Sequence, residues 1–524
     1  VLAEHCDPQG EFVVAKAWSG PFSRFMELHS MLGFTNHEKF STRPRGLTRF
    51  LVDKHQLFYA LWLQHTSLRL SGGHLADILI RDHGNRKIRF VKLPHHSVHA
   101  ATACYTSAFE KAACMVIDGQ GEKGAMSFFD YSDGRLRLIE QAKGPESLGI
   151  LYSVCTDACG FDSEGGEEWK LMGLAPYGKL DPALMDEFRE LVTIDGLKVK
   201  YPAQKTLESW VERLKRRARP EGASSMAWAD FAYTTQAFYC EAMNRLLGNF
   251  HRLGLSDNLV LGGGCGLNSS YNGQIVGLTP FKQVHVPCAP GDDGNALGAA
   301  LLAFYQDNPS RKAPARIQSP YLGSSLSRGA VEHLVKFSGF PKLHHHPGRV
   351  HEVAAQLLAD GKLLGWVQGR AEYGPRALGN RSILADPRPA DMKDKINSRV
   401  KFREEFRPFA PSILDEYGPE YFENYQLTPY MERTLTFKES AKQKVAAIVH
   451  VNMTGRLQSV RREWNERYYD LIKAFHGITG VPMLLNTSFN IMGKPIIHSL
   501  EDAVGVFLTT GLDVLVIDDY IIEK

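Results

Sequence analysis

Two short apolar segments that run directly into turns of glycine and acidic residues most constrain the fold of this chain. Residues 113–117 run into Asp118, and residues 259–261 run into three consecutive glycines. Short apolar runs bounded by turn residues are typical of buried strands. Between them, apolar residues from Phe231 to Leu246 recur every three to four positions, which predicts a long amphipathic helix. This alternation of strands and helices predicts an α/β fold.

A segment rich in proline, serine and arginine at residues 307–328 divides the chain. Its composition and lack of apolar periodicity predict a linker. We therefore expect a front domain at 1–306 and a back domain at 329–524. The back part carries apolar runs at 363–367, 446–451, 483–485 and 514–517 with helical stretches between them, which predicts a second α/β domain with a mixed sheet.

Size and charge restrict the possible functions. A chain of 524 residues predicts roughly two to four domains. The net charge of +3 argues against nucleic acid as the main partner, and the basic run at 215–219 is typical of a solvated helix end. No apolar run is long enough to span a membrane, so we expect neither a membrane span nor a signal peptide. The 8 scattered cysteines include no CxxC pair, which favours a reducing, cytoplasmic location.

Histidines and carboxylates suggest a metal site. His95 and His99 would lie one turn apart on the same helix face, a spacing that lets two imidazoles bind one ion. Asp118 follows a buried strand, and Asp292 and Asp293 precede a helix. Two histidines with one or two carboxylates suit iron, manganese or zinc.

Glycine-rich turns suggest a nucleotide site in the front part. The turn at 262–268 follows a strand, and its glycines would let the backbone approach a phosphate or purine closely. It is neither a Walker A loop nor a Rossmann fingerprint. A second turn at 291–294 follows, and the pair resembles the adenosine and phosphate turns of actin-like ATPase folds.

Arginines among glycine, proline and phenylalanine suggest an anion site in the back part. Arg376 and Arg407 lie among glycine, proline and phenylalanine, which favours an anion site over surface salt bridges, and Arg456 lies beside a glycine. Arginine binds phosphate in a bidentate manner. Asn486 follows an apolar strand, where side chains point into a site. We expect a small, multiply charged anion to bind there.

Together these motifs resemble the O-carbamoyltransferase family that includes tobramycin, cephalosporin and nodulation-factor carbamoyltransferases. The matching stretches run in order from about residue 90 to the C-terminus: HHSVHA, VIDGQGE, KLMGLAPYG, GGGCGLN, GDDGNALGAA, EYGPRALGNRSILADPR, FRPFAP and LLNTSFN. The resemblance implies an actin-like, Kae1-like front domain and a YrdC-like back domain with a mixed sheet.

The resemblance also implies an ATP-dependent reaction. Carbamoyl phosphate and ATP would give carbamoyl adenylate in the back domain, and the front domain would pass the carbamoyl group to a small-molecule hydroxyl beside a divalent metal, usually iron. The metal ligands would be His95, His99, Asp118 and Asp292, with Asp293 competing for the last place. The general base would be His96 or Asp118.

The remaining implied residues bind the substrates. The nucleotide would face Lys170, Gly173, Gly263, Gly264, Asn268 and Asp293, and carbamoyl phosphate would be held by Arg376, Arg407, Arg456 and Asn486, with Arg376 and Arg407 also stabilising the charge of departing pyrophosphate. The acceptor is open, and a homodimer is the common default.

Three alternatives use the same motifs. A tRNA-modifying enzyme of the threonylcarbamoyl type would need a basic face, which the net charge does not favour. Carbamoyl transfer to a protein cysteine would come with CxxC zinc modules, and a purely nucleotide-binding protein would not need the arginines. Family members also open with a His-Asp-Ser/Ala turn and an EERF-type segment. Neither precedes His95 here, so we expect that part of the front end to be missing.

Overall fold

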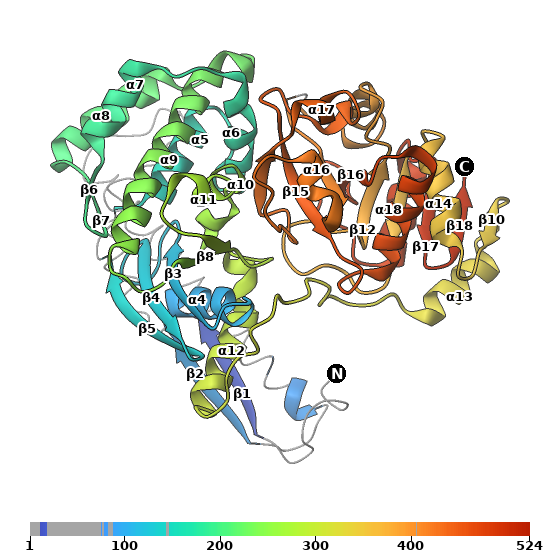
Figure 1. Ribbon diagram of the computed structural model, residues 1–524, viewed down its shortest axis with the longest axis horizontal. Helices are drawn as coiled ribbons and strands as arrows, with labels where there is room; N and C mark the ends of the chain where they lie inside the picture. The colour runs from blue at the N-terminus through green and yellow to red at the C-terminus, as the bar shows by residue number, and fades with distance from the viewer. Residues whose placement is uncertain (1–10, 18–74, 76–77, 82–86, 143–145, 405) are drawn as a thin grey trace, which may run out of the picture.

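The computed structural model describes residues 11–17, 75, 78–81, 87–142, 146–404 and 406–524. Its front and back halves lie side by side and are joined by an extended segment along one edge (Figure 1). That segment lies between α12 (Asn295–Asp307) and α13 (Arg328–Phe337). It contains no helix and no strand beyond an isolated bridge between Ser325 and Arg370.

The front half is built on a 5-stranded sheet of order β5-β4-β3-β8-β9. β3 pairs in parallel with β8, and β8 with β9, whereas β4 and β5 add antiparallel pairs. The strands are β3 (Lys111–Ile117), β4 (Met126–Ser132), β5 (Arg135–Gln141), β8 (Asn258–Gly262) and β9 (Gln283–His285).

Helices cover both faces of this sheet. Ala113, Met115 and Ile117 of β3 belong to the core beneath α5 (Leu148–Ala158) and α9 (Ala229–His251). The alternate residues Ala112, Cys114 and Val116 belong to the core beneath α4 (His95–Tyr105) and α12. Successive side chains of a strand point to opposite faces, so a strand covered on both faces is apolar throughout. This explains the uninterrupted apolar run from which β3 was predicted.

The other front elements surround this sandwich. The parallel pair of β1 and β2 extends below it in Figure 1. The elements are β1 (Phe12–Ala17), β2 (Ile88–Leu93), α6 (Glu168–Leu174), α7 (Pro182–Leu191), β6 (Thr193–Asp195), β7 (Lys198–Lys200), α8 (Gln204–Arg217), α10 (Ser269–Asn272) and α11 (Ile275–Leu278).

The back half is built on a 9-stranded sheet of order β10-β18-β17-β11-β12-β16-β13-β15-β14. It combines parallel pairs, such as β11 with β17, and antiparallel pairs, such as β12 with β16, which confirms the predicted mixed sheet. The strands are β10 (Leu343–His345), β11 (Leu364–Val367), β12 (Arg381–Ala385), β13 (Ala410–Leu414), β14 (Arg433–Thr436), β15 (Thr454–Val460), β16 (Met483–Ser488), β17 (Val514–Ile517) and β18 (Tyr520–Glu523).

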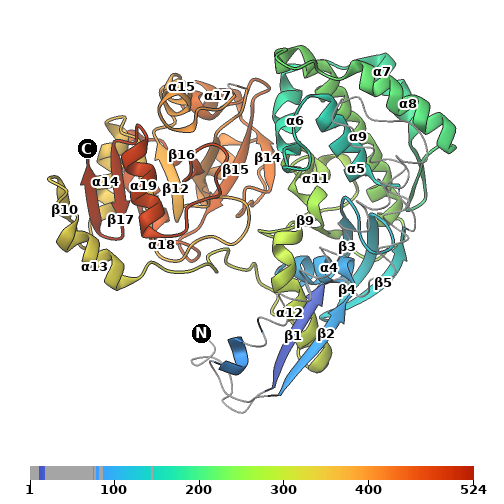
Figure 2. The same cartoon turned by 180° about the vertical axis from the view of Figure 1, so that it is seen from behind.

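Helices flank this second sheet, with α19 packed against β17 and α18 packed against β13 and β16 (Figures 1 and 2). They are α13, α14 (Val350–Ala359), α15 (Met392–Ile396), α16 (Gly418–Tyr421), α17 (Glu439–Lys442), α18 (Glu466–Thr479) and α19 (Leu500–Thr509). Three of the four apolar runs noted in the back part are strands. The run at 446–451 is not, because Ala447 and Ile448 reach the core from a single turn of 3-10 helix and Val451 is exposed.

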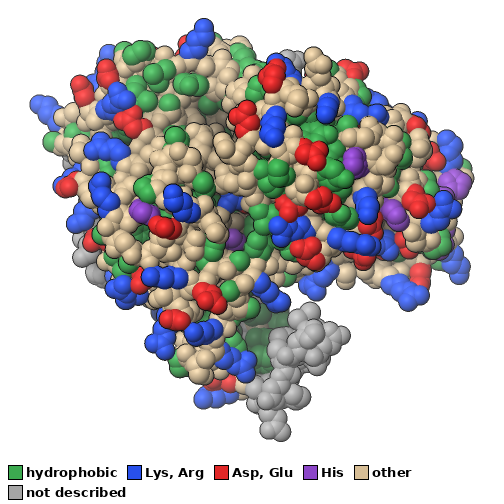
Figure 3. Space-filling view, in the orientation of Figure 1, with side chains coloured by type: hydrophobic (Ala, Val, Ile, Leu, Met, Phe, Trp, Pro, Cys, Tyr) green, Lys and Arg blue, Asp and Glu red, His purple; other side chains and the backbone are tan. Residues whose placement is uncertain are grey.

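Charge is mixed on the visible surface. Lysine and arginine alternate with aspartate and glutamate over the face in Figure 3, and no continuous basic stripe crosses it. Within the described residues, no helix has both the length and the apolar character needed to cross a membrane.

Candidate functional site

The first residues of α4 form the centre of one site. Pro94 precedes the helix and offers no side-chain cap. Instead, the Glu122 carboxylate accepts a hydrogen bond from the backbone N–H of His95 at 2.9 Å. An acidic group at a helix N-terminus satisfies a free donor and complements the helix dipole. Glu122 therefore anchors the turn that carries the histidines, a role that sequence reasoning missed.

The four predicted metal ligands converge. The Nε2 atoms of His95 and His99 lie 3.2 Å apart. Asp118 Oδ2 lies 3.1 Å from His95 Nε2 and 3.3 Å from His99 Nε2. Asp292 Oδ1 lies 3.4 and 3.2 Å from the same two atoms. One ligand atom from each of the four residues falls within 4.8 Å of the others. Two nitrogens and two carboxylate oxygens fit a divalent transition metal.

Both carboxylates are held in place by neighbouring groups. Asp118 Oδ1 accepts hydrogen bonds from the backbone N–H groups of Gly119 and Gly264, at 2.9 and 3.1 Å. Asn295 Nδ2 donates to Asp292 Oδ1 at 2.9 Å. Burial raises the pKa of Asp118, but hydrogen bonds from His95 and His99 hold it well below its usual range. Asp118 is therefore ionised, as a metal ligand must be.

Asp293, the competing candidate, has different surroundings. Its carboxylate is not among the four converging groups. Burial raises the pKa of Asp293. Burial also lowers the pKa of Arg376 in the back half, and the negative charge of Asp293 partly offsets that lowering. Tyr373 also donates a hydrogen bond to the backbone oxygen of Asp293 at 2.8 Å. Asp292 thus faces the histidines, while Asp293 lies beside the back half.

His96 lies beside the cluster as a neutral imidazole. Its Nδ1 contacts Ser127 Oγ at 2.7 Å, and its Nε2 is buried without a hydrogen-bond partner among the described residues. Burial lowers the pKa of His96 to about 3. A Cβ added at Gly121 would lie 2.4 Å from His96 Nε2, so the glycine keeps room for the ring.

The glycine turn at residues 262–268 packs closely against the end of β3, the strand that precedes the metal-site residue Asp118. Gly263 has φ +89°, and a Cβ there would lie 2.2 Å from the Ile117 backbone oxygen. Glycine tolerates this conformation and this close approach. Asn268 caps α10 through a bond from Tyr271 N, and its amide pairs with Gln236 at 3.1 and 3.2 Å. Its hydrogen-bonding groups are thus engaged within the fold.

A second site lies in a cavity of about 1590 Å³ between the halves. α6 and α11 border it from the front half, and β14 and β15 from the back half (Figures 1 and 2). Six predicted site residues line it: Lys170, Gly173, Arg376, Arg407, Arg456 and Asn486. The four metal-site residues do not line it. The sequence-predicted residues therefore form two separate groups.

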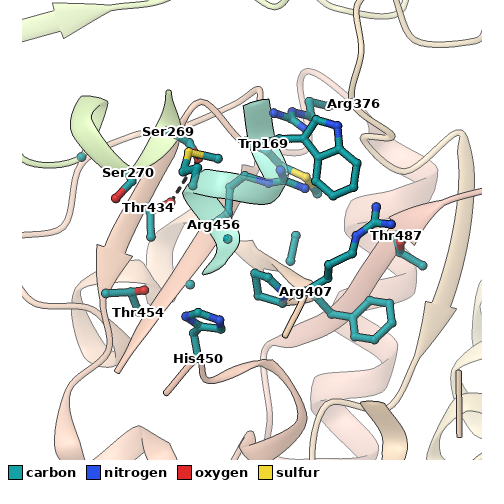
Figure 4. A pocket seen from close by; sticks show the side chains of 18 of the residues that line it. Trp169, Ser269, Ser270, Arg376, Arg407, Thr434, His450, Thr454, Arg456 and Thr487 are labelled. Carbon is teal, nitrogen blue, oxygen red and sulfur yellow. Dashed lines mark hydrogen bonds between the residues drawn. The ribbon is translucent and has the colours of Figure 1, made fainter. Parts of the chain in front are cut away.

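Cationic side chains crowd one end of the cavity, and Figure 4 shows Arg376, Arg407 and Arg456 directed into it beside Trp169. Burial lowers the pKa of Arg456, and the charges of Arg376, Arg403 and Arg407 lower it further. Burial and the charges of Arg403 and Arg407 also hold the pKa of Lys401 well below its usual range. Arg456 Nε and Arg403 Nη2 have no hydrogen-bond partner among the described residues. Like charges gathered with unused donors indicate a site for a polyanion.

Asn486 supports this end of the cavity from the sheet. Its Nδ2 lies 3.2 Å from the backbone oxygen of Ala377, next to Arg376, and 3.0 Å from Ser412 Oγ. Its Oδ1 is buried without a partner among the described residues. The amide nitrogen holds the Arg376 loop, and the oxygen is the atom left for a ligand.

Lys170, predicted to face a nucleotide, lies at the arginine end of the cavity. Its ammonium forms ion pairs with Glu167 at 2.6 Å and with Glu404 of the back half at 2.9 Å. Sequence reasoning missed two other cavity residues, Trp169 and Glu404, and it counted Lys401 and Arg403 with the anion-site motifs without giving either a separate role. Each lies in or beside a motif noted in the sequence, and that proximity was the available signal.

Comparisons with known proteins assign each half of the chain to a family model. A family model described as carbamoyltransferase N-terminus matches residues 49–301, and one described as carbamoyltransferase C-terminus matches residues 355–524. The chain belongs to the carbamoyltransferase family. The first match holds the metal cluster and the second holds the arginines, so this carbamoyltransferase carries residues of both sites.

Relatives match over most of the enzyme. Nodulation protein NolNO of Sinorhizobium fredii is 39% identical over 84% of this chain and 64% of its own length. Nodulation protein NolO of Bradyrhizobium diazoefficiens is 38% identical, with 82% and 78% covered. An uncharacterized Synechocystis protein is 33% identical, with 92% and 83% covered. The carbamoyltransferase chain thus spans less than two thirds of the length of NolNO, and more than two thirds of the length of NolO and of the Synechocystis protein.

A more distant likeness is to solved HypF structures. The crystal structure of T. kodakarensis HypF matches at TM-score 0.27 and 14% identity, covering 47% of this chain and 41% of that one.

Proposed function

We propose that this carbamoyltransferase uses ATP and carbamoyl phosphate to make carbamoyl adenylate, and transfers the carbamoyl group to a hydroxyl of a small molecule. The observation that carries the proposal is the group of cations Arg376, Lys401, Arg403, Arg407 and Arg456 in the cavity. Buried cations in mutual repulsion favour a ligand with several negative charges. Carbamoyl phosphate, ATP and pyrophosphate are such ligands.

The first half-reaction releases two phosphate products. Water cleaves carbamoyl phosphate to inorganic phosphate and carbamate, and a carbamate oxygen then attacks the α-phosphorus of ATP. The bond to the β-phosphate breaks, and pyrophosphate leaves with its electron pair. Arg376, Arg407 and Arg456 would stabilise the charge that builds on the leaving group. Carbamate decomposes in water, so a cavity enclosed by two halves favours its use before it escapes.

The second half-reaction belongs to the cluster on α4. The acceptor oxygen attacks the carbamoyl carbon, and AMP leaves while a base takes the hydroxyl proton. His95, His99, Asp118 and Asp292 would hold a divalent metal, for which iron, manganese and zinc all suit the donor set. When bound, such an ion supplies Lewis-acid polarisation of an oxygen ligand. His96 is a neutral base beside it, and Asp118 is the alternative.

The two family matches cover different halves of the chain, and we assign one half-reaction to each half. We propose that the front half is the Kae1-like, actin-like transfer domain and the back half the YrdC-like adenylate-forming domain. The front domain would span 1–306 and the back domain 329–524, with the linker between. Asp293 contributes at the boundary, because its charge acts on Arg376. The family match does not favour the tRNA-modifying alternative.

The decisive experiment measures AMP and pyrophosphate formed from ATP, with and without carbamoyl phosphate, for the wild type and Arg376→Ala. We expect pyrophosphate release that requires carbamoyl phosphate and falls at least about 100-fold in the variant, the loss typical when a charge-stabilising donor is removed. Release with bicarbonate and threonine instead would favour the tRNA-type reaction. Absence of release from metal-loaded protein would refute the adenylate route.

A further inference from the structure

Arg407 is held by a residue from the other half of the molecule. Its guanidinium carbon lies 3.9 Å from the centre of the Trp169 ring, at the start of α6. Its ion pair with Glu404 is a long contact, 3.3 Å from Nη1 to Oε2. A cation over an indole face is attracted by the ring quadrupole, most strongly where water is excluded.

The partner of that ion pair is also controlled from α6. Glu404 Oε1 lies 2.9 Å from the ammonium of Lys170, the residue after Trp169. Lys170 is steadied in turn by Glu167 at 2.6 Å. Two consecutive residues of one front-half helix thus hold both the guanidinium and the carboxylate that faces it.

The loop that carries Arg407 is anchored in the front half. Phe406 is 4% exposed and belongs to the front-half core, with its ring 6.1 Å from that of Phe161. His450 Nε2 lies 3.3 Å from the Phe406 backbone oxygen on the back-half side. The loop is therefore held by contacts from both halves of the molecule.

We infer that Trp169 is a positioning residue for Arg407, and that the phosphate site of the back half is completed across the interface by α6. The inference rests on the proposed function, because it concerns the same arginine cluster. It has a functional consequence: a carbamoyl phosphate site that needs α6 in place forms the adenylate only when the transfer domain is docked to receive it.

The test uses the full chain with pyrophosphate as the probe, measured by titration calorimetry, together with KM and kcat for carbamoyl phosphate. Trp169→Ala should weaken pyrophosphate binding and raise KM about 3- to 30-fold, the range of a partly buried cation–π contact, with a smaller change in kcat. Trp169→Phe keeps an aromatic face and should stay within about threefold of the wild type. A purely structural role would not give this rescue.

A double-mutant cycle identifies the partner. In an Arg407→Ala background, Trp169→Ala should have no further effect on the dissociation constant, because the guanidinium it positions is gone. Trp464→Ala is the matched control, since Trp464 stacks on Arg461 at 5.0 Å but does not line the cavity. It should leave pyrophosphate binding unchanged.

The outcomes separate two failures. One contrary result is that Trp169→Ala weakens pyrophosphate binding equally in the wild-type and Arg407→Ala backgrounds, and another is that it weakens binding in neither background. Either result would overturn the positioning role of Trp169 while leaving the anion site intact. If wild-type protein did not bind pyrophosphate at all, the proposed function would fail together with this inference.

Discussion

The two carboxylate oxygens of Asp118 have different partners. Oδ1 accepts a hydrogen bond from the backbone N–H of Gly264 at 3.1 Å, and Oδ2 faces the histidines, 3.1 Å from His95 Nε2. Asp118 follows β3 and Gly264 follows β8, and these strands are parallel neighbours. Both turns therefore meet at the same edge of the sheet, where function commonly gathers in α/β folds. The glycine turn fixes the direction of the carboxylate, and this relationship leads to the first prediction.

Gly263→Ala should damage both stability and metal binding. The added Cβ would meet the Ile117 backbone oxygen at 2.2 Å in a left-handed conformation. We expect a loss of about 1–3 kcal/mol in unfolding free energy and weaker Mn²⁺ binding, because Gly264 and Asp118 must move. Urea unfolding and Mn²⁺ titration measure these effects. Gly248→Ala in α9, where a Cβ meets open space, should be neutral or stabilising. Equal behaviour of the two variants would contradict the argument.

Asp292 and Asp293 should differ in metal binding. Asp292→Asn removes one of the four converging oxygens, so the Mn²⁺ dissociation constant should rise at least about tenfold. Asp293→Asn, the neighbouring control, should bind Mn²⁺ as the wild type does. Electron paramagnetic resonance of free Mn²⁺ distinguishes them. A greater loss in the Asp293 variant would reverse the assignment of the fourth ligand.

Burial of His285 should make stability depend on pH. Burial, aided by the charge of Arg433, lowers the pKa of His285 from 6.5 to about 3. The unfolded chain therefore takes up a proton below about pH 6.5 while the folded chain does not, so stability falls as the pH drops from that value toward 3.

The expected difference can be measured by urea unfolding. Between pH 7.5 and 5.5, the wild type should lose about 1.4 kcal/mol more than His285→Gln, which lacks the titrating group. His344→Gln, on the exposed strand β10, should follow the wild type. Parallel curves for the wild type and His285→Gln would refute this origin of the pH dependence.

Phe406→Ala should destabilise the contact between the halves. Removing a buried phenylalanine from a packed core costs about 3–5 kcal/mol. The loss should appear in urea unfolding, together with weaker pyrophosphate binding, because Arg407 lies on the same loop. Phe402→Ala, four residues earlier and 60% exposed, should change the unfolding free energy by less than about 0.5 kcal/mol. A similar effect of both variants would show that the Phe406 anchor is not what holds the loop.

Local patterns were sufficient for part of this structure. His95 and His99 converge because a helix places every fourth residue on one face, a property of the backbone alone. β3 and β8 were recognisable because each is a short apolar run that ends at a turn. The run at 446–451 shows the limit, since apolar residues can also reach the core from a turn when the surrounding chain closes over them.

The sequence by itself determined the α/β class, the histidines and aspartates that are candidates to bind a metal, and the arginine-rich motifs, because these depend on residue type and short spacing. Only the tertiary structure decided that Asp292 rather than Asp293 faces the histidines, that Asn268 pairs with Gln236, and that Lys170 lies among the arginines. It also brought Trp169 onto Arg407. Contacts between residues far apart in sequence depend on how the two halves dock, and no local pattern encodes that geometry.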